Sequence, residues 1–396
     1  MSSDTSTDRH LDTATGFRYD RFTVTCVMSF GLLVAGLSTG VILGELREEL
    51  DLSGVVATAH GSMFGVGLLV VGAFGLPLVA RVGRALVFWS SCAAIAGGIG
   101  LLCLGHVAPL TLTGCLISGF ACAMLVMLMP GILADHWGEH RAEAFAAVNG
   151  IPGFVGIAFS VVVGAVIAAG FTWRWPYALL TIALGSGVVI LGRGMRLPAA
   201  PPVEAQVLRL FRDRSVLQPY LGIVHGVMCE FPIGVLSVVY LKEAGGASGG
   251  VAAILAGVWG LSLSVTRLLL TRLVAFAGLW SRSVAYLFVV AGTLVMWAGP
   301  ALLIRTAGLL IVGVGAAALY PLAVDRLYLR EGADTVALGA IAALGSGTAI
   351  VLGPIGLGVL FDTVGVRDSI LAVTVLALVG VFSYLPSLQR ARAVAS

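Results

Sequence analysis

The sequence predicts an all-α membrane protein with twelve transmembrane helices. The chain has 396 residues, of which 59% are hydrophobic and 11% are charged, and its mean hydropathy is +1.03. Soluble domains are about 45–50% apolar and about 25% charged, so this chain departs from them in both respects. Its apolar residues also form stretches long enough to cross a hydrocarbon core about 30 Å thick. This pattern excludes an ordinary soluble protein.

The apolar stretches follow one another along the chain and are separated by short polar or basic segments. The segment 1–21 is rich in Ser, Thr and Asp and is expected to be disordered. It lacks the apolar core of a cleavable signal peptide, so the first span is expected to direct insertion. We expect spans at about 22–43, 54–79, 85–104, 109–133, 144–170, 177–192, 216–241, 250–270, 283–299, 302–324, 337–360 and 370–387.

The polar segments between spans are expected to be loops. The stretch 197–215 is proline-rich and then basic, which is typical of a linker between two halves of a protein. The other expected loops are 45–53, 134–143, 243–249, 271–282, 325–334 and 361–369. The six cysteines all lie inside apolar stretches without a CxxC pair, so we expect neither a zinc site nor a disulfide framework.

Basic residues are distributed unevenly between the two sides that these spans imply. If the N-terminus is cytoplasmic, 18 of the 23 arginine and lysine residues lie on the cytoplasmic side. The other side holds Arg47, Arg174, Lys242, Arg305 and Arg367. Cytoplasmic loops carry an excess of basic residues, so we predict a multi-pass protein of the cytoplasmic membrane with both termini in the cytoplasm. The near absence of lysine is typical of a GC-rich bacterial genome.

The segment between the second and third spans resembles the matching loop of the major facilitator superfamily. That family has Gly-x-Leu-Ala-Asp-Arg-x-Gly-Arg there, and this chain matches it at Leu78, Arg81, Gly83 and Arg84. The turn Trp173–Trp175 is similar to the family's turn between spans five and six, and residues 353–358 are similar to its eleventh helix.

This resemblance implies two six-helix bundles that work by alternating access. We expect the bundles at 22–196 and 216–388, joined by a cytoplasmic linker at 197–215, with cytoplasmic tails at 1–21 and 389–396. The transport path is then expected between spans 1, 2, 4 and 5 and spans 7, 8, 10 and 11. A weak internal echo accompanies this division, because Gly164 and Arg174 recur as Gly358 and Arg367.

The chain departs from the family pattern at several positions. Ala80 stands where the family has its loop Asp, and we expect Asp135 to replace that acid by pairing with Arg81 or Arg84. We assign Arg81, Gly83, Arg84, Asp135 and Arg267 to a cytoplasmic gate, with a snorkelling charge as a second interpretation of Arg267.

Two further departures concern the N-terminal half. Cys115 stands four residues before Gly119, where many members have Arg. Ser160 and Val161 stand where drug–proton antiporters have Gly-Pro, which argues against a multidrug exporter.

The stretch 216–241 carries one carboxylate, Glu230, near its middle. An ionisable side chain near the bilayer centre costs about 3 kcal/mol or more, so it has to face protein or a water-filled cavity. Glu230 is interpreted either as an alternately exposed proton carrier or as a structural acid bonded to a neighbouring helix. We favour the proton carrier, because an unpaired acid at this depth is expensive to retain. Glu230 and the segment Tyr240–Glu243 also resemble the fucose-permease branch of the family.

Histidine and asparagine side chains within the spans are further candidates for a solute cavity. His225 is five residues from Glu230, which places the two side chains about 140° apart on a helix. His225 and His60 either line the cavity or make hydrogen bonds between helices. Asn149, the only asparagine in the chain, needs partners for its amide, and either solute or a neighbouring helix supplies them.

Two aromatic side chains are candidates for a ring-stacking wall. Trp259 lies in the eighth span and Tyr320 in the tenth. Packing within the protein or anchoring at the membrane interface is the alternative for each.

No motif of an enzyme or of a nucleotide-driven pump is present, and we expect no metal or cofactor. The sequence therefore predicts a monomeric secondary transporter of a small organic solute, surrounded by membrane lipid, with coupling to protons through Glu230 and no nucleic-acid partner. The alternatives are an exporter of an apolar metabolite or drug, or a non-transporting membrane sensor or lipid-handling protein.

Overall fold

The computed structural model describes residues 17–197, 214–328 and 335–385, and every regular element within them is helical. The N-terminal half forms α1 (Arg21–Leu37), α2 (Thr39–Leu50), α3 (Gly54–Val82), α4 (Arg84–Leu104), α5 (Ala108–Trp137), α6 (Arg141–Ala168) and α7 (Arg174–Gly192). The C-terminal half forms α9 (Arg214–Glu243), α10 (Gly249–Ala277), α11 (Ser281–Ala298), α12 (Leu302–Tyr328), α13 (Thr335–Val364), α14 (Val366–Ser369) and α15 (Leu371–Ser383). The 3₁₀ turns Gly138–His140 and Gly278–Trp280 precede α6 and α11.

Twelve segments of the described chain are long and apolar enough to cross a membrane, which confirms the predicted number of spans. The first span is α1 continued by α2, and the last is α14 continued by α15. The helix is interrupted at Ser38, between α1 and α2. The Ser38 carbonyl oxygen accepts a hydrogen bond from the Tyr177 hydroxyl at 2.5 Å. The same carbonyl also accepts from the backbone N–H of Val41 at 3.1 Å, so groups of α2 and α7 both satisfy it where lipid would offer no partner.

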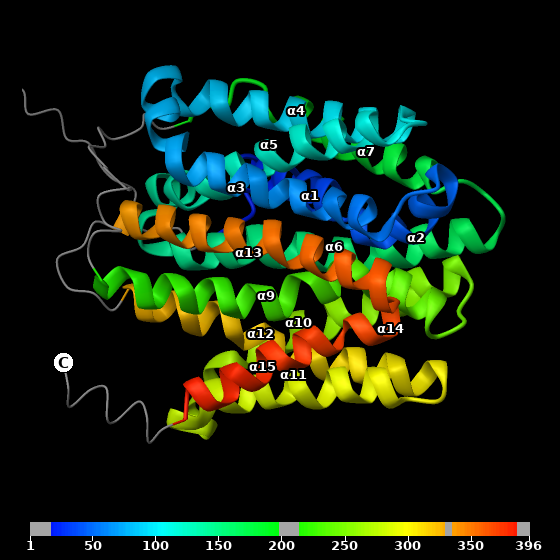
Figure 1. Ribbon diagram of the computed structural model, residues 1–396. Coiled ribbons are helices and arrows are strands. Elements are labelled where there is room, and N and C mark those ends of the chain that lie inside the picture. The colour runs from blue at the N-terminus through cyan, green and yellow to red at the C-terminus, as the bar shows by residue number, and fades with distance from the viewer. Residues whose placement is uncertain (1–16, 198–213, 329–334, 386–396) are drawn as a thin grey trace, which may run out of the picture.

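The helices form two bundles that lie side by side (Figure 1). Helices α1 to α7, coloured blue to green, make the N-terminal bundle, and α9 to α15, coloured green to red, make the C-terminal bundle. We name the two ends of the molecule by residues: the Glu45 end, where α2 and α9 finish, and the Arg81 end, where α3 finishes. The exact bundle limits, the linker and the two tails remain predictions, since much of them lies outside the described residues.

Glycines bring the two bundles into close contact. A Cβ atom on Gly65 of α3 would lie 2.8 Å from the carbonyl oxygen of Gly347 on α13, and a Cβ on Gly347 would lie 2.9 Å from that of Gly65. Gly164 of α6 and Gly250 of α10 meet in the same way, at 2.6 and 2.5 Å. Small residues let membrane helices approach backbone to backbone, which replaces the hydrophobic driving force that lipid removes.

The two bundles repeat the same contacts. Gly358 of α13 packs on Gly54 at the start of α3, just as Gly164 of α6 packs on Gly250 near the start of α10. The backbone-binding arginines repeat as well: Arg174 Nε donates to the Cys103 carbonyl at 2.7 Å, and Arg367 Nε donates to the Trp297 carbonyl at 2.9 Å. The internal echo in the sequence therefore marks structurally equivalent positions.

Several segments that the sequence analysis expected as loops are helical. Residues 45–50 belong to α2, 134–137 to α5, 141–143 to α6, 271–277 to α10 and 325–328 to α12, while 361–364 end α13 and 366–369 form α14. Hydropathy marks the part of a helix that lies in hydrocarbon. The backbone hydrogen bonds continue past that part into water, so polar residues extend the helices beyond the predicted limits.

We predict that Gly65→Ala destabilises the protein, because the added Cβ collides with the backbone of α13. Overpacking of this kind costs about 1–3 kcal/mol, which outweighs the gain in helix propensity of about 0.5–1 kcal/mol. Thermal unfolding of the purified protein should shift downwards. Gly97→Ala is the matched control, because no atom lies within 4 Å of a Cβ there and α4 is regular. Equal melting temperatures for the two variants would contradict the proposed role of Gly65.

Candidate functional site

Glu230 of α9 forms an ion pair with Arg267 of α10. Its Oε1 accepts a hydrogen bond from Arg267 Nη2 at 2.7 Å, and Arg267 Nε also donates to the Ala317 carbonyl of α12 at 3.5 Å. The Glu230 side chain is 14% exposed and that of Arg267 is 40% exposed. The expectation of an unpaired acid is therefore corrected, since the chain supplies a guanidinium that neutralises the carboxylate.

One polar atom of this pair and one of a neighbouring tryptophan have no hydrogen-bond partner. Oε2 of Glu230 and Nε1 of Trp259 are both buried and unpartnered, one an acceptor and the other a donor. The Trp259 ring packs against Gly234, one helical turn beyond Glu230 on the same face of α9, because a Cβ on Gly234 would lie 2.9 Å from the ring. The unpartnered acceptor and the unpartnered donor thus lie along one side of α9.

Tyr320 of α12 completes this group in the C-terminal bundle. Its side chain lies within electrostatic range of Glu230, Arg267 and the Ser346 hydroxyl of α13. Four residues that the sequence analysis selected separately, on three helices, are therefore brought together. Ser346 is a further member of the group, and no sequence signal distinguishes it, because serine is common in membrane helices.

His225 lies apart from this group. Its Nε2 is 2.8 Å from the Leu376 carbonyl and its Nδ1 is 2.9 Å from the Tyr286 hydroxyl, whose ring stacks on the imidazole. A carbonyl can only accept, so Nε2 carries the proton and Nδ1 accepts from the tyrosine. Both ring nitrogens are occupied within the C-terminal bundle, and we leave His225 out of the site that we propose.

His60 has a similar internal arrangement in the N-terminal bundle. Its Nδ1 donates to the Val56 carbonyl at 2.9 Å, and its Nε2 lies 2.9 Å from the Thr111 hydroxyl of α5. The side chain is almost fully buried between α3 and α5. It ties two helices of one bundle together, and no nitrogen remains for a solute.

Asn149 lies on the same side of α6 as Ser160, three helical turns further on, which packs near Gly257 of α10. Gly156, two turns beyond Asn149, packs on Val34 of α1, so Asn149 lies between the α1 side and the α10 side of α6. Its Nδ2 donates to the Phe145 carbonyl at 2.9 Å, and the residue is exposed.

The predicted gate residues lie at the Arg81 end. Arg84 at the start of α4 forms an ion pair with Asp135 of α5, which is the replacement pairing that the sequence analysis expected. Gly83 makes the turn between α3 and α4 with a φ of 90°, a backbone conformation that favours glycine. Arg81 is exposed, and Arg267 lies deeper, at the Glu230 pair. Gating by these residues remains a prediction.

A set of charges that the sequence analysis did not select joins the two bundles at the Glu45 end. We call it the closure cluster. Lys242 Nζ of α9 lies 2.9 Å from Glu45 and 2.7 Å from Glu48 of α2, and Arg47 pairs with Glu243. The density of charges in residues 45–49 is the sequence signal of this cluster, but charge density alone does not distinguish such a cluster from an ordinary polar loop.

The start of α3 is held by the same kind of contact. Asp362 at the end of α13 accepts from the backbone N–H groups of Gly54 at 2.6 Å and of Val55 at 3.0 Å. A carboxylate at a helix N-terminus satisfies free donors and complements the helix dipole. Because Asp362 belongs to the other bundle, this cap is a further contact of the closure cluster.

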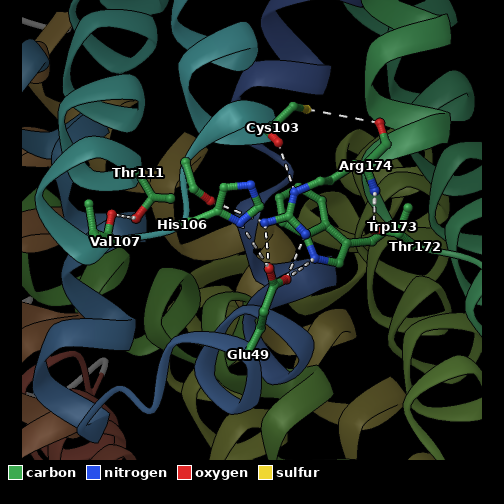
Figure 2. A network of polar contacts seen from close by, with 9 residues as sticks. Glu49, Cys103, His106, Val107, Thr111, Thr172, Trp173 and Arg174 are labelled. Carbon is green, nitrogen blue, oxygen red and sulfur yellow. Dashed lines mark hydrogen bonds and ion pairs between the residues drawn. The ribbon is translucent and has the colours of Figure 1, made fainter.

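A second polar network supports the closure cluster from within the N-terminal bundle (Figure 2). Glu49 of α2 accepts from Arg174 at 2.7 and 2.6 Å and from the Trp173 indole at 3.3 Å, with His106 at 3.8 Å. Arg174 also binds the Cys103 and Gly105 carbonyls, so one arginine connects α2, the end of α4 and the start of α7.

Residues 23–328 match the Major Facilitator Superfamily, and the chain belongs to this family. It is therefore a multi-pass membrane protein of a transporter family, with twelve spans in two bundles. One similar protein is an MFS-type transporter, paaT, of Penicillium rubens, which is 31% identical over 184 residues. That match covers 42% of this chain and 31% of the relative, so the chain spans about a third of that protein's length.

Solved structures of transporters share the fold. The nucleoside transporter NupG has a TM-score of 0.71 at 14% identity and covers 92% of this chain and 98% of its own. The peptide transporter POT in complex with sulfate has a TM-score of 0.72 at 14% identity, covering 93% and 95%. A bacterial homologue of the human lysosomal transporter Spinster, in an inward-facing and occupied conformation, has a TM-score of 0.69 at 14% identity, covering 93% and 97%.

We predict that Lys242→Met weakens the contact between the two bundles at the Glu45 end. Partly exposed ion pairs contribute about 0.2–1 kcal/mol each, and the loss of about 1 kcal/mol raises the open-to-closed ratio about fivefold. Distances between spin labels placed at the ends of α2 and α9 measure this ratio. Arg367→Gln is the control, because Arg367 binds the Trp297 carbonyl within one bundle. An unchanged distance distribution for Lys242→Met would show that the cluster does not hold the two bundles together.

Proposed function

We propose that this chain is a secondary active transporter that moves a small organic solute by alternating access, with coupling to protons through Glu230. The observation that carries the proposal is the Glu230–Arg267 pair, with an unpartnered carboxylate oxygen and an unpartnered indole N–H beside it. Buried polar atoms without partners are rare, and each calls for an explanation such as a ligand.

The ion pair provides a physical route to proton coupling. Removing the charge of one member of a buried pair leaves the other charge uncompensated, which costs about 3–5 kcal/mol. A proton on Glu230 therefore expels the Arg267 guanidinium from its place against the carboxyl group. Arg267 is 40% exposed and has room to move away, so protonation of Glu230 and the position of Arg267 change together.

The hydrogen-bonding atoms without partners indicate the charge and polarity of the solute. The C-terminal bundle offers one acceptor on Glu230 and one donor on Trp259, and the N-terminal bundle offers the amide oxygen of Asn149. The Glu230 charge is already balanced by Arg267, which favours a neutral, polar or amphipathic solute over a multiply charged one.

The contacts between the bundles support a state that is closed at the Glu45 end. The closure cluster lies there, and the contacts between α6 and α10 run from Gly164 and Gly250 to Ile157 and Gly260. Further towards the Arg81 end, Asn149 of α6 and Leu268 of α10 are exposed.

The distribution of basic residues indicates which end of the molecule faces the cytoplasm. We propose that the Arg81 end is cytoplasmic, with Arg84 and Asp135 as part of its cytoplasmic gate.

A thermal-shift screen over sugars, carboxylates, nucleosides and cationic dyes at two pH values identifies the solute class. Solute-dependent proton flux in proteoliposomes then tests the proposal. An exporter of an apolar metabolite or drug would be stabilised by the lipophilic cationic dyes rather than by the sugars, carboxylates or nucleosides, and a non-transporting sensor would bind solute without any flux.

We predict that Glu230→Gln folds and still exchanges solute across the membrane but no longer accumulates it against a gradient. The glutamine side chain is neutral like the protonated carboxyl group, so Arg267 stays displaced, and the amide cannot release a proton. Uptake driven by a pH gradient, compared with counterflow at equal pH, separates the two activities. Glu139→Gln, which changes an exposed acid in the turn before α6, serves as the control. Full accumulation by Glu230→Gln would eliminate this residue as the proton carrier.

We predict that Trp259→Phe weakens solute binding and leaves the proton stoichiometry unchanged. The substitution keeps an aromatic ring on Gly234 and deletes one N–H donor, which corresponds to about 0.5–1.5 kcal/mol or a rise in apparent KM of about three- to tenfold. Trp175→Phe, at an exposed position of α7, is the matched control. If both variants keep the original KM, the indole N–H does not bind solute.

A further inference from the structure

A hollow of about 500 Å³ lies between α4 and α7, on the side of the N-terminal bundle. Its walls include Ala96, Gly100 and Cys103 of α4 and Thr181, Gly185 and Ser186 of α7. Sites for small molecules typically occupy about 300–1,000 Å³, so this hollow has the volume of a ligand site.

Contacts at both ends of the two helices hold the hollow open. Towards the Arg81 end, Gly192 of α7 packs directly on the Trp89 ring of α4. Towards the Glu45 end, Arg174 of α7 binds the Cys103 carbonyl of α4, and Figure 2 shows this contact as part of the Glu49 network. The helices are fixed at these two points, and small side chains between them leave the space unfilled.

Thr181 gives this mostly apolar hollow a polar group without a partner, whereas the Ser186 hydroxyl donates to the Ala183 carbonyl. The residue is 8% exposed, and its hydroxyl is buried without a hydrogen-bond partner. A threonine within a helix normally satisfies its hydroxyl by bonding a backbone carbonyl three or four residues earlier. Eight other helical threonines of the described chain do so: Thr25, Thr58, Thr111, Thr113, Thr293, Thr306, Thr348 and Thr363. Thr181 differs from them, and it lines the hollow.

The residues around the hollow indicate that a ligand reaches it from the lipid. Leu179, Ile182 and Ile190 of α7 are exposed on a helix that spans the membrane, so this side faces lipid. Phe171 and Trp175 are exposed near Arg174, as aromatic residues are at a membrane interface. Thr181 lies seven residues further along α7, which places it about 10 Å below that interface.

We propose that this hollow binds a membrane-dissolved small molecule that is mostly hydrocarbon and carries one hydroxyl or carbonyl oxygen. The apolar walls take the hydrocarbon, and the Thr181 hydroxyl, which reaches the hollow by rotation about its Cα–Cβ bond, hydrogen-bonds the oxygen. A phospholipid acyl chain is a poorer occupant, because its ester groups lie at the interface and its tail leaves Thr181 unpartnered. This site is separate from the Glu230 group, so it stands independently of the proposed function.

Photolabelling of the full-length protein in lipid nanodiscs tests the proposal with two probes, an octanol and an octane that each carry a diazirine. We expect saturable labelling of α4 and α7 by the alkanol probe, detected by mass spectrometry of the peptides. Thr181→Val has the same shape without the hydroxyl, and it should lower labelling by the alkanol about three- to tenfold while labelling by the alkane stays the same.

Filling the hollow provides a second variant with its own control. No atom lies within 4 Å of a Cβ on Gly100 or on Gly97, so both accept a larger side chain without collision. Gly100 lines the hollow and Gly97 is exposed on the same helix. Gly100→Leu should abolish labelling by both probes, and Gly97→Leu should leave it unchanged. Equal labelling by alkane and alkanol, unaffected by Thr181→Val, would overturn the proposal and leave the hollow to lipid tails.

Discussion

The cost of unpaired polar groups in lipid is the constraint on which this structure depends. Every backbone donor and acceptor within the bilayer has to be satisfied inside the protein, which leaves helices as the way for this chain to cross. The helix interruption at Ser38 shows the rule in a single case, because its carbonyl accepts from both the Val41 N–H and the Tyr177 hydroxyl. Charged side chains obey the same constraint, and most lie near the ends of the helices or beyond them.

The Glu230–Arg267 pair is the main exception, and its chemistry follows from its depth. The two charges are tolerable together and costly apart, so anything that changes the charge of Glu230 also changes the preferred position of Arg267. The unpartnered atoms of Glu230 and Trp259 adjoin this pair. We propose that proton, guanidinium and solute compete for this one small region, and that this competition couples proton movement to solute movement.

Contacts between the bundles are made by two different kinds of residue. Glycines such as Gly65 and Gly347 join the helices within the span, where charges would be costly. Charged residues of the closure cluster join them at the Glu45 end, where water lowers the cost of separating the charges again. A transporter that alternates between two states needs contacts that can be broken, and partly exposed ion pairs meet this need because each contributes only about 0.2–1 kcal/mol.

The sequence by itself determined the number of spans, the family and the carboxylate around which the proposed site is built, because hydropathy and the Arg81–Arg84 loop motif are local signals. It left helix ends uncertain by several residues, since backbone hydrogen bonds continue past the apolar part of a helix, as in α2 and α10. The tertiary structure alone decided that Glu230 meets Arg267, that His60 and His225 are tied up within their own bundles, and that Lys242 reaches Glu45. These partners lie far apart in sequence, and a residue's spacing on its own helix gives the direction of its side chain but not the helix that it meets.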